Sequence, residues 1–194
     1  MVNHPTNHIS IAVTGHRFIP NDGRLDQSIR KIFETFLNEH LDADFILYSP
    51  LAEGSDQIAA RIASEFDRFE LHVPLPMNIK EYLEDFHTEN GRETFFQLFS
   101  SASVVHHLDT EDDHQASYRA LGQYLVNHSD ILLAVWNGVY NQKMGGTSDV
   151  IRIATHAQKP VYWIYCSNEK PGEVNSLQDQ KQIGDIEILN PKYL

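Results

Sequence analysis

Glycine and hydroxyl-bearing residues gather at the start of one helical segment, in the order Gly145, Gly146, Thr147, Ser148. Glycines let a ligand approach the backbone closely, and the free N–H groups of a helix N-terminus attract anions. The pattern therefore predicts a cradle for a phosphate group. It is not a P-loop, because no Gly-Lys-Ser/Thr follows the glycines, and a Gly-Gly-Thr stretch by itself is a weak signal.

A second polar stretch, Ser49–Asp56, reads Ser-Pro-Leu-Ala-Glu-Gly-Ser-Asp. Gly54, Ser55 and Asp56 precede a helical pattern, so they can form an anion site or simply begin a helix. For Ser55 and Asp56, capping the helix is the more ordinary role. Glu53 is not needed as a cap, and its carboxylate could accept hydrogen bonds from ribose hydroxyls, as could that of Asp56.

The third stretch is Thr14-Gly15-His16-Arg17, directly after an apolar run. Gly15 permits a tight turn, Thr14 offers a hydroxyl, and the planar guanidinium of Arg17 suits phosphate or carboxylate. The alternative is a plain turn in which Arg17 is solvated and His16 lies on the surface. Position alone does not decide between the two.

Short apolar runs and amphipathic patterns alternate along the chain and must position these loops. The runs are rich in β-branched and aromatic residues, which is typical of strands buried on both faces, and they cover Ile9–Val13, Phe45–Tyr48, Leu71–Val73, Val104–His107, Ile131–Trp136 and Pro160–Cys166. Helical spacing of apolar residues occurs in Leu25–Leu37, Ile58–Phe66, Tyr118–Leu125 and Val150–Ala157. Residues 77–101 are predicted to form two short helices broken at Asn90-Gly91.

Strand followed by helix, repeated, predicts an α/β fold: a single Rossmann-like three-layer domain with a mainly parallel sheet of about six strands. The domain spans 1–194, with a core at about 8–166 and a polar C-terminal tail, 167–194. The alternation at Ile186–Leu189 fits an edge strand, an oligomer contact or a disordered tail. Ligands of such sheets bind at the carboxyl ends of the strands, so the three loops, with Trp136 and Gly138, should meet at one crevice.

Composition excludes several classes of protein. The 194 residues include 15 Lys+Arg and 27 Asp+Glu, a net charge of −12, which excludes an extended basic face for nucleic acid or membrane lipid. The single Cys166 cannot form an intramolecular disulfide, which indicates a reducing compartment. No apolar run reaches the roughly 18 residues that span a bilayer, and residues 1–10 lack a signal-peptide core. We expect a soluble, cytoplasmic protein.

Metal and nucleophile chemistry find little support in the sequence. Adjacent His106 and His107 should point to opposite faces of a strand, and no G-x-S-x-G elbow is present. Gly15 is not part of a G-x-G-x-x-G fingerprint, which weakens an NAD-binding interpretation. No metal and no resident cofactor are therefore expected.

The three loops together resemble the SLOG superfamily, the Rossmann-like group that includes the cytokinin-activating phosphoribohydrolases and the DNA-processing protein A family. The resemblance covers about residues 8–166 and is most specific in the Gly-Ser-Asp and Gly-Gly-Thr loops. It implies a fold that places a nucleotide's phosphate and ribose against glycine-rich loops. The chain is most similar to small bacterial members of unassigned function.

The chain departs from the phosphoribohydrolase pattern Pro-Gly-Gly-x-Gly-Thr-x-x-Glu, in which the glutamate acts in N-glycosidic cleavage. Met144 replaces the proline, one x-Gly step is missing, and Val150 stands where the glutamate would be. The nearest carboxylate, Asp149, is one position early, and a shift by one residue turns a helical side chain by about 100°. The resemblance therefore supports binding more than hydrolysis.

Three functions follow from the sequence. The first is a sensor or signalling domain that binds a nucleotide-type small molecule: Arg17 and Gly145–Thr147 would hold phosphate, and Glu53 or Asp56 ribose. The second is a nucleotide N-glycosidase or ribosyl transferase with Glu53 and Asp149 as catalytic candidates. The third is an acidic protein-interaction module. A homodimer is compatible with the fold, but no residue pattern requires one.

Overall fold

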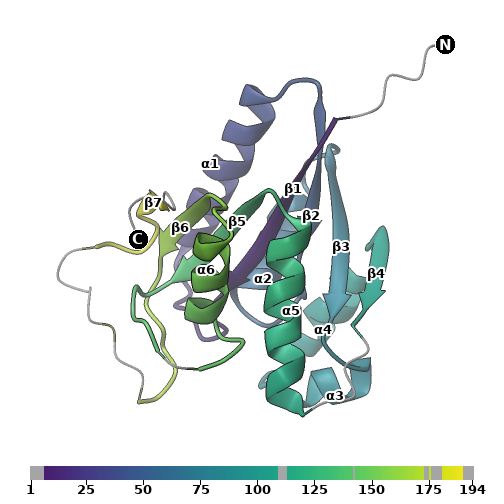
Figure 1. Ribbon diagram of the computed structural model, residues 1–194, viewed down its shortest axis with the longest axis vertical. Helices are drawn as coiled ribbons and strands as arrows, with labels where there is room; N and C mark the ends of the chain where they lie inside the picture. Colours follow the sequence, from purple (N-terminus) through teal and green to yellow (C-terminus); the bar gives the residue numbers. More distant parts are fainter. Residues whose placement is uncertain (1–6, 109–112, 142, 173–174, 176–180, 190–194) are drawn as a thin grey trace.

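All six apolar runs form strands, and a seventh strand comes from the C-terminal tail (Figure 1). The computed structural model describes residues 7–108, 113–141, 143–172, 175 and 181–189. Within them, one sheet has the order β4-β3-β2-β1-β5-β6-β7. Its strands are β1 (Asn7–Gly15), β2 (Ala43–Tyr48), β3 (Phe69–Leu75), β4 (Val104–His107), β5 (Ile131–Trp136), β6 (Val161–Tyr165) and β7 (Ile186–Leu189).

Every strand pair is parallel except the last. β7 runs antiparallel to β6, with Ile188 opposite Tyr162, so the alternation in the tail is an edge strand. The chain moves outward from β1 to β4 and then returns to place β5 on the other side of β1. The junction of β1 and β5 is therefore the point where the strand order reverses.

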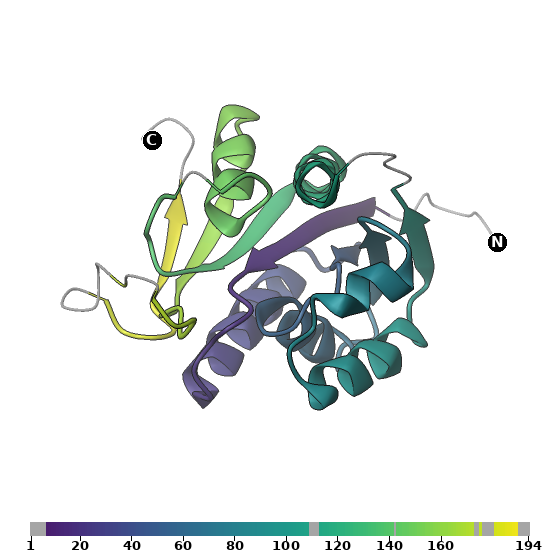
Figure 2. The same cartoon turned by 90° about the horizontal axis from the view of Figure 1, so that it is seen from below.

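Helices cover both faces of the sheet, which gives three layers (Figure 2). One face carries α1 (Gly23–Glu39), α2 (Ser55–Ala63), α3 (Ile79–Glu84) and α4 (Glu89–Phe99), and the other carries α5 (His114–His128) and α6 (Thr147–His156). This is the α/β, Rossmann-like three-layer domain that the alternating pattern predicts. None of the helices in the described residues has the length and apolar character needed to cross a membrane.

The continuous apolar character of β1 follows from burial on both faces. Ile11 and Val13 belong to the core beneath α1 and α2, whereas Ala12 belongs to the core beneath α5 and α6. All three side chains are inaccessible to solvent. Successive residues of a strand point to opposite faces, so a strand covered on both sides must be apolar at every position.

Residues 77–101 do form two short helices, but the predicted break at Asn90-Gly91 is wrong. The break lies at residues 85–88, and α4 begins at Glu89. Thr88 caps α4, because its hydroxyl accepts a hydrogen bond from the Gly91 N–H at 2.9 Å. Gly91 therefore lies in the first helical turn, and its role is packing: a Cβ there would lie 2.2 Å from Oε1 of Glu53.

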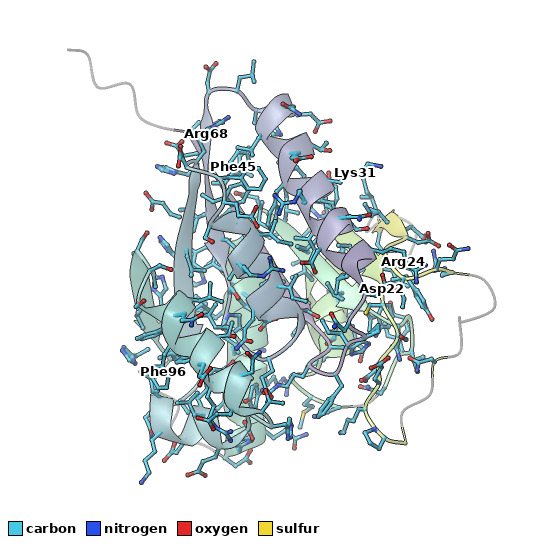
Figure 3. The ribbon with its side chains drawn as sticks, turned by 180° about the vertical axis from the view of Figure 1, so that it is seen from behind. Asp22, Arg24, Lys31, Phe45, Arg68 and Phe96 are labelled. Carbon is cyan, nitrogen blue, oxygen red and sulfur yellow. The ribbon has the colours of Figure 1, made fainter. Side chains whose placement is uncertain are left out.

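The loop after β1 is fixed at its far end by the start of α1. The Asp22 carboxylate accepts a hydrogen bond from the Arg24 N–H at 2.9 Å and pairs with the Arg24 guanidinium at 2.6 Å (Figure 3). The loop is therefore held at both ends: its first residue follows β1 directly, and its last residues are held at the start of α1. The loop carries His16 and Arg17 to the edge of the sheet.

Candidate functional site

A cavity of about 490 Å³ lies at the carboxyl ends of β1 and β5, where the strand order reverses. Open α/β sheets bind ligands at this place. The cavity brings together residues of all three predicted loops and of the end of β5: Thr14, Gly15, His16, Arg17, Asp56, Trp136, Gly145, Gly146, Thr147 and Ser148. Glu53, Gly54, Ser55, Gly138 and Asp149 are not among its lining residues.

Glycines allow the loops after β1 and β2 to interlock. A Cβ on Gly15 would lie 2.5 Å from Oγ of Ser55, and one on Gly54 would lie 2.5 Å from the Arg17 carbonyl oxygen. Gly54 also has a φ of +82°, which favours glycine. The Ser55 hydroxyl donates to the His16 carbonyl at 2.8 Å. Gly54 and Ser55 thus position the β1 loop and lie behind the cavity wall.

The imidazole of His16 links the loop after β1 to the end of β5. Its Nε2 accepts a hydrogen bond from the Asn137 N–H at 3.0 Å, which places the proton of a neutral ring on Nδ1. Gly138 follows with a φ of +78° and turns the chain back, so that the Trp136 indole donates to the Val139 carbonyl at 3.2 Å. Gly138 shapes this wall from outside the cavity.

The guanidinium of Arg17 is held between α3 and α5. It donates to the carbonyl of Asp85 at 2.9 Å and to the hydroxyl of Tyr118 at 2.7 Å, and lies over the Tyr118 ring at 5.4 Å. The Tyr118 hydroxyl in turn donates to the Asp85 carboxylate, which also pairs with Nε2 of His114 at 2.9 Å. Within the part of the chain that the structure describes, these contacts use two of the five Arg17 donors.

Asp56 is a buried carboxylic acid on the wall of the cavity. Its side chain belongs to the first turn of α2 but does not cap it, because Gly54 occupies the N-cap without a side-chain hydrogen bond. Asp56 is 6% exposed. Burial raises its pKa to about 7, although the charge of Arg17 and a hydrogen bond from the Ala52 backbone act in the opposite direction.

Glu53 faces away from this cavity and holds the start of α4. Its carboxylate accepts hydrogen bonds from the His87 N–H at 2.7 Å, the Thr88 N–H at 2.9 Å and the Thr88 hydroxyl at 2.7 Å. Burial raises the pKa of Glu53, but these hydrogen bonds outweigh it and hold the pKa below its ordinary value. It lines a smaller cavity of about 180 Å³.

The start of α6 borders the large cavity without a side-chain cap. Gly146 is the N-cap residue and makes no side-chain hydrogen bond to the helix. The carboxylate of Asp149 accepts the Gly145 N–H at 2.9 Å and pairs with Arg152, so it fixes the glycine loop instead of lining the cavity. The first turn of α6 therefore presents its partial positive charge at the site.

Several lining residues come from segments outside the predicted loops. Two of them, Tyr82 and Asp85, follow the Pro74–Pro76 segment at the carboxyl end of β3. Their position after a strand predicts that they overhang the crevice, with packing in a helix as the alternative. The others come from the starts of α4 and α5, from the loop before α6 and from the tail: His87, His114, Gln115, Tyr118, Lys143, Asn168 and Lys170. In a parallel sheet, the helices that follow the strands begin at this same edge. The predicted strand pattern therefore contained a signal for these residues.

Comparison with known proteins finds matches among solved structures. No protein-family model matches the chain, and no curated protein matches it. Among solved structures, the chain is similar to the X-ray structure of TM1055, a Northeast Structural Genomics Consortium target. The identity is 15%, the TM-score is 0.48, and the match covers 79% of this chain and 72% of that one. A similarity at this level says nothing about function.

Proposed function

We propose that this protein binds a phosphorylated, nucleotide-derived small molecule in the large cavity and acts as a sensor or signalling domain of the SLOG type. The observation that carries the proposal is the start of α6, an uncapped helix N-terminus that borders a cavity of about 490 Å³ at the switch point of the sheet. Such a terminus is a ready anion site, and cavities of this size hold small molecules.

The charges around the cavity support an anion at its outer end. Lys143 and Lys170 are exposed and line the cavity, as does the first turn of α6. Local positive potential of this kind can attract a phosphate even to a protein with a net charge of −12. Arg17 has a structural role in this proposal and not the phosphate-binding one, because its hydrogen bonds join the end of α3 to α5.

A thermal-shift screen tests the proposal with ADP-ribose, NAD, nucleoside monophosphates and cyclic dinucleotides. A ligand at 100 times its Kd stabilises the folded state by about 2.7 kcal/mol. For a chain of this size, that corresponds to a rise in Tm of about 5–10 °C. Unchanged melting curves across the whole panel would contradict the proposal.

A second candidate, cleavage of an N-glycosidic bond, is favoured by Asp56. A carboxylic acid on the cavity wall with a pKa of about 7 suits general acid–base catalysis near neutral pH. In this reaction Asp56 would take a proton from water as the water oxygen bonds to the anomeric carbon, while the C–N bond breaks and the base leaves with the bonding pair. Glu53 and Asp149 fit the role less well, because hydrogen bonds hold both outside the cavity lining.

Chromatography of incubated nucleotides distinguishes the two candidates. An enzyme would release free base, and Asp56→Asn would abolish the release. Binding without any release from the same nucleotides would leave only the first candidate.

A further inference from the structure

Two buried polar groups mark the inner end of the large cavity. Asp56 is 6% exposed and Tyr82 is 0% exposed, whereas Lys143 and Lys170 at the outer end are exposed. The Tyr82 ring is fixed edge-to-face against Phe86, with ring centroids 5.4 Å apart. The inner end is therefore formed by two side chains that are buried in the cavity wall, and the outer end by residues that are exposed.

The hydroxyl of Tyr82 has no hydrogen-bond partner among the described residues. Burial raises its pKa well above the ordinary value, so the hydroxyl keeps its proton and remains a donor. A buried polar group without a partner destabilises the folded state, and native proteins tolerate few of them. One other described tyrosine, Tyr165, has an equally unpaired hydroxyl. Both tyrosines belong to core clusters, but Tyr165 does not line the cavity.

We infer that Asp56 and Tyr82 form a subsite for the vicinal hydroxyl groups of the ligand's sugar, which rests on the proposed function. A cis-diol carries two donors and two acceptors. The Asp56 carboxylate can accept from the diol, as acidic residues do with ribose in dinucleotide-binding folds. The Tyr82 hydroxyl can donate to one of its oxygens.

The charges at the inner end favour a neutral group over a second phosphate. The carboxyl groups of Asp56 and Asp85 both interact electrostatically with Arg17, so its single positive charge is already offset by two acidic side chains. An anion placed beside them would be repelled by any ionised carboxylate. The ligand is thereby oriented with its sugar inward, at Asp56 and Tyr82, and its phosphate outward, at the start of α6.

Calorimetric titration of AMP, 2′-deoxy-AMP, 3′-deoxy-AMP and CMP tests the subsite. Loss of either hydroxyl leaves a buried group unpaired and should weaken binding about tenfold. Asp56→Leu, which has no hydrogen-bond acceptor, and Tyr82→Phe should remove most of this difference between AMP and its deoxy analogues. Tyr165→Phe is the matched control and should retain it, since it removes an equally unpaired hydroxyl elsewhere.

Each outcome decides the inference. Equal affinity for AMP and both deoxy analogues in the wild-type protein overturns it, as does a full preference for AMP in Asp56→Leu and Tyr82→Phe. A loss of affinity from AMP to CMP that Asp56→Leu abolishes would instead assign Asp56 to the base. If no nucleotide in a broad panel binds, the proposed function fails as well; binding without a hydroxyl preference overturns the subsite alone.

Discussion

Replacement of Asp56 by asparagine should stabilise the protein increasingly as the pH rises. The pKa of Asp56 is raised from 3.8 to about 7 in the folded state, chiefly by burial. The folded state therefore holds a proton that the unfolded chain has already released. The contribution of Asp56 to stability is fully present below pH 3.8 and is lost as the pH rises towards 7.

The size of the effect follows from the width of this window. Between pH 5 and about pH 7, the unfolded chain is mostly ionised at Asp56 while the folded state is mostly protonated. In this range the free energy of unfolding of the wild-type protein falls by about 1.36 kcal/mol for each pH unit. The stability difference between Asp56→Asn and wild type should therefore grow by about 3 kcal/mol from pH 5 to pH 8. Asparagine does not titrate, so any packing cost of the substitution is the same at every pH and does not affect this pH-dependent change.

Urea denaturation at pH 5, 6, 7 and 8 measures the difference, with the free energy of unfolding taken from linear extrapolation. An m-value equal in both proteins at each pH is the control for a change in the unfolded state. If the difference in the free energy of unfolding between variant and wild type stays constant across this range, the carboxyl group of Asp56 ionises at an ordinary pH, and its burial in the folded state is refuted.

Three further predictions concern the framework of the site. Glu53→Gln should lower the free energy of unfolding by about 1–3 kcal/mol at pH 7, because it weakens the bonds to His87 and Thr88; equal urea midpoints would contradict this. Gly145→Ala should cost more stability than Gly172→Ala by at least about 1 kcal/mol. Both have positive φ, but among the described residues an added Cβ meets a neighbour only at Gly145, where the Tyr118 backbone would lie 2.7 Å away. Cys166 should react with a thiol reagent no faster than the protein unfolds, since it is inaccessible and burial raises its pKa to about 12; rapid labelling of the native protein would show otherwise.

The fold was largely predictable because its sheet is buried on both faces. Continuous apolar runs such as Ile131–Trp136 are typical of central strands. The alternation of strands and helices along the chain followed from these runs. The carboxyl-end loops could then be assigned to one edge from topology alone. This is why Gly15, Asp56 and Gly146, which are far apart in the sequence, were correctly expected near one another.

The roles of individual side chains at that edge were not predictable. Glu53 and Asp56 are three residues apart in one loop, yet Glu53 turns to α4 while Asp56 lines the cavity. The difference depends on the backbone N–H groups at residues 87 and 88, whose position is set by the whole fold. The same long-range contact explains the wrong break at Asn90-Gly91, since Gly91 is there to accommodate Glu53.

The most direct test of the binding site is titration calorimetry of ADP-ribose against the wild-type protein and two variants that each add one negative charge. Thr147→Glu places the charge in the first turn of α6, and Asn90→Asp places it in the first turn of α4, away from the large cavity. An acidic residue in the first turn stabilises a helix by about 0.3–1 kcal/mol, so both variants should fold.

A phosphate bound at the start of α6 requires that Thr147→Glu abolish the binding of ADP-ribose and that Asn90→Asp leave it unchanged. Binding of ADP-ribose with equal affinity to all three proteins would contradict the assignment of the phosphate site to α6.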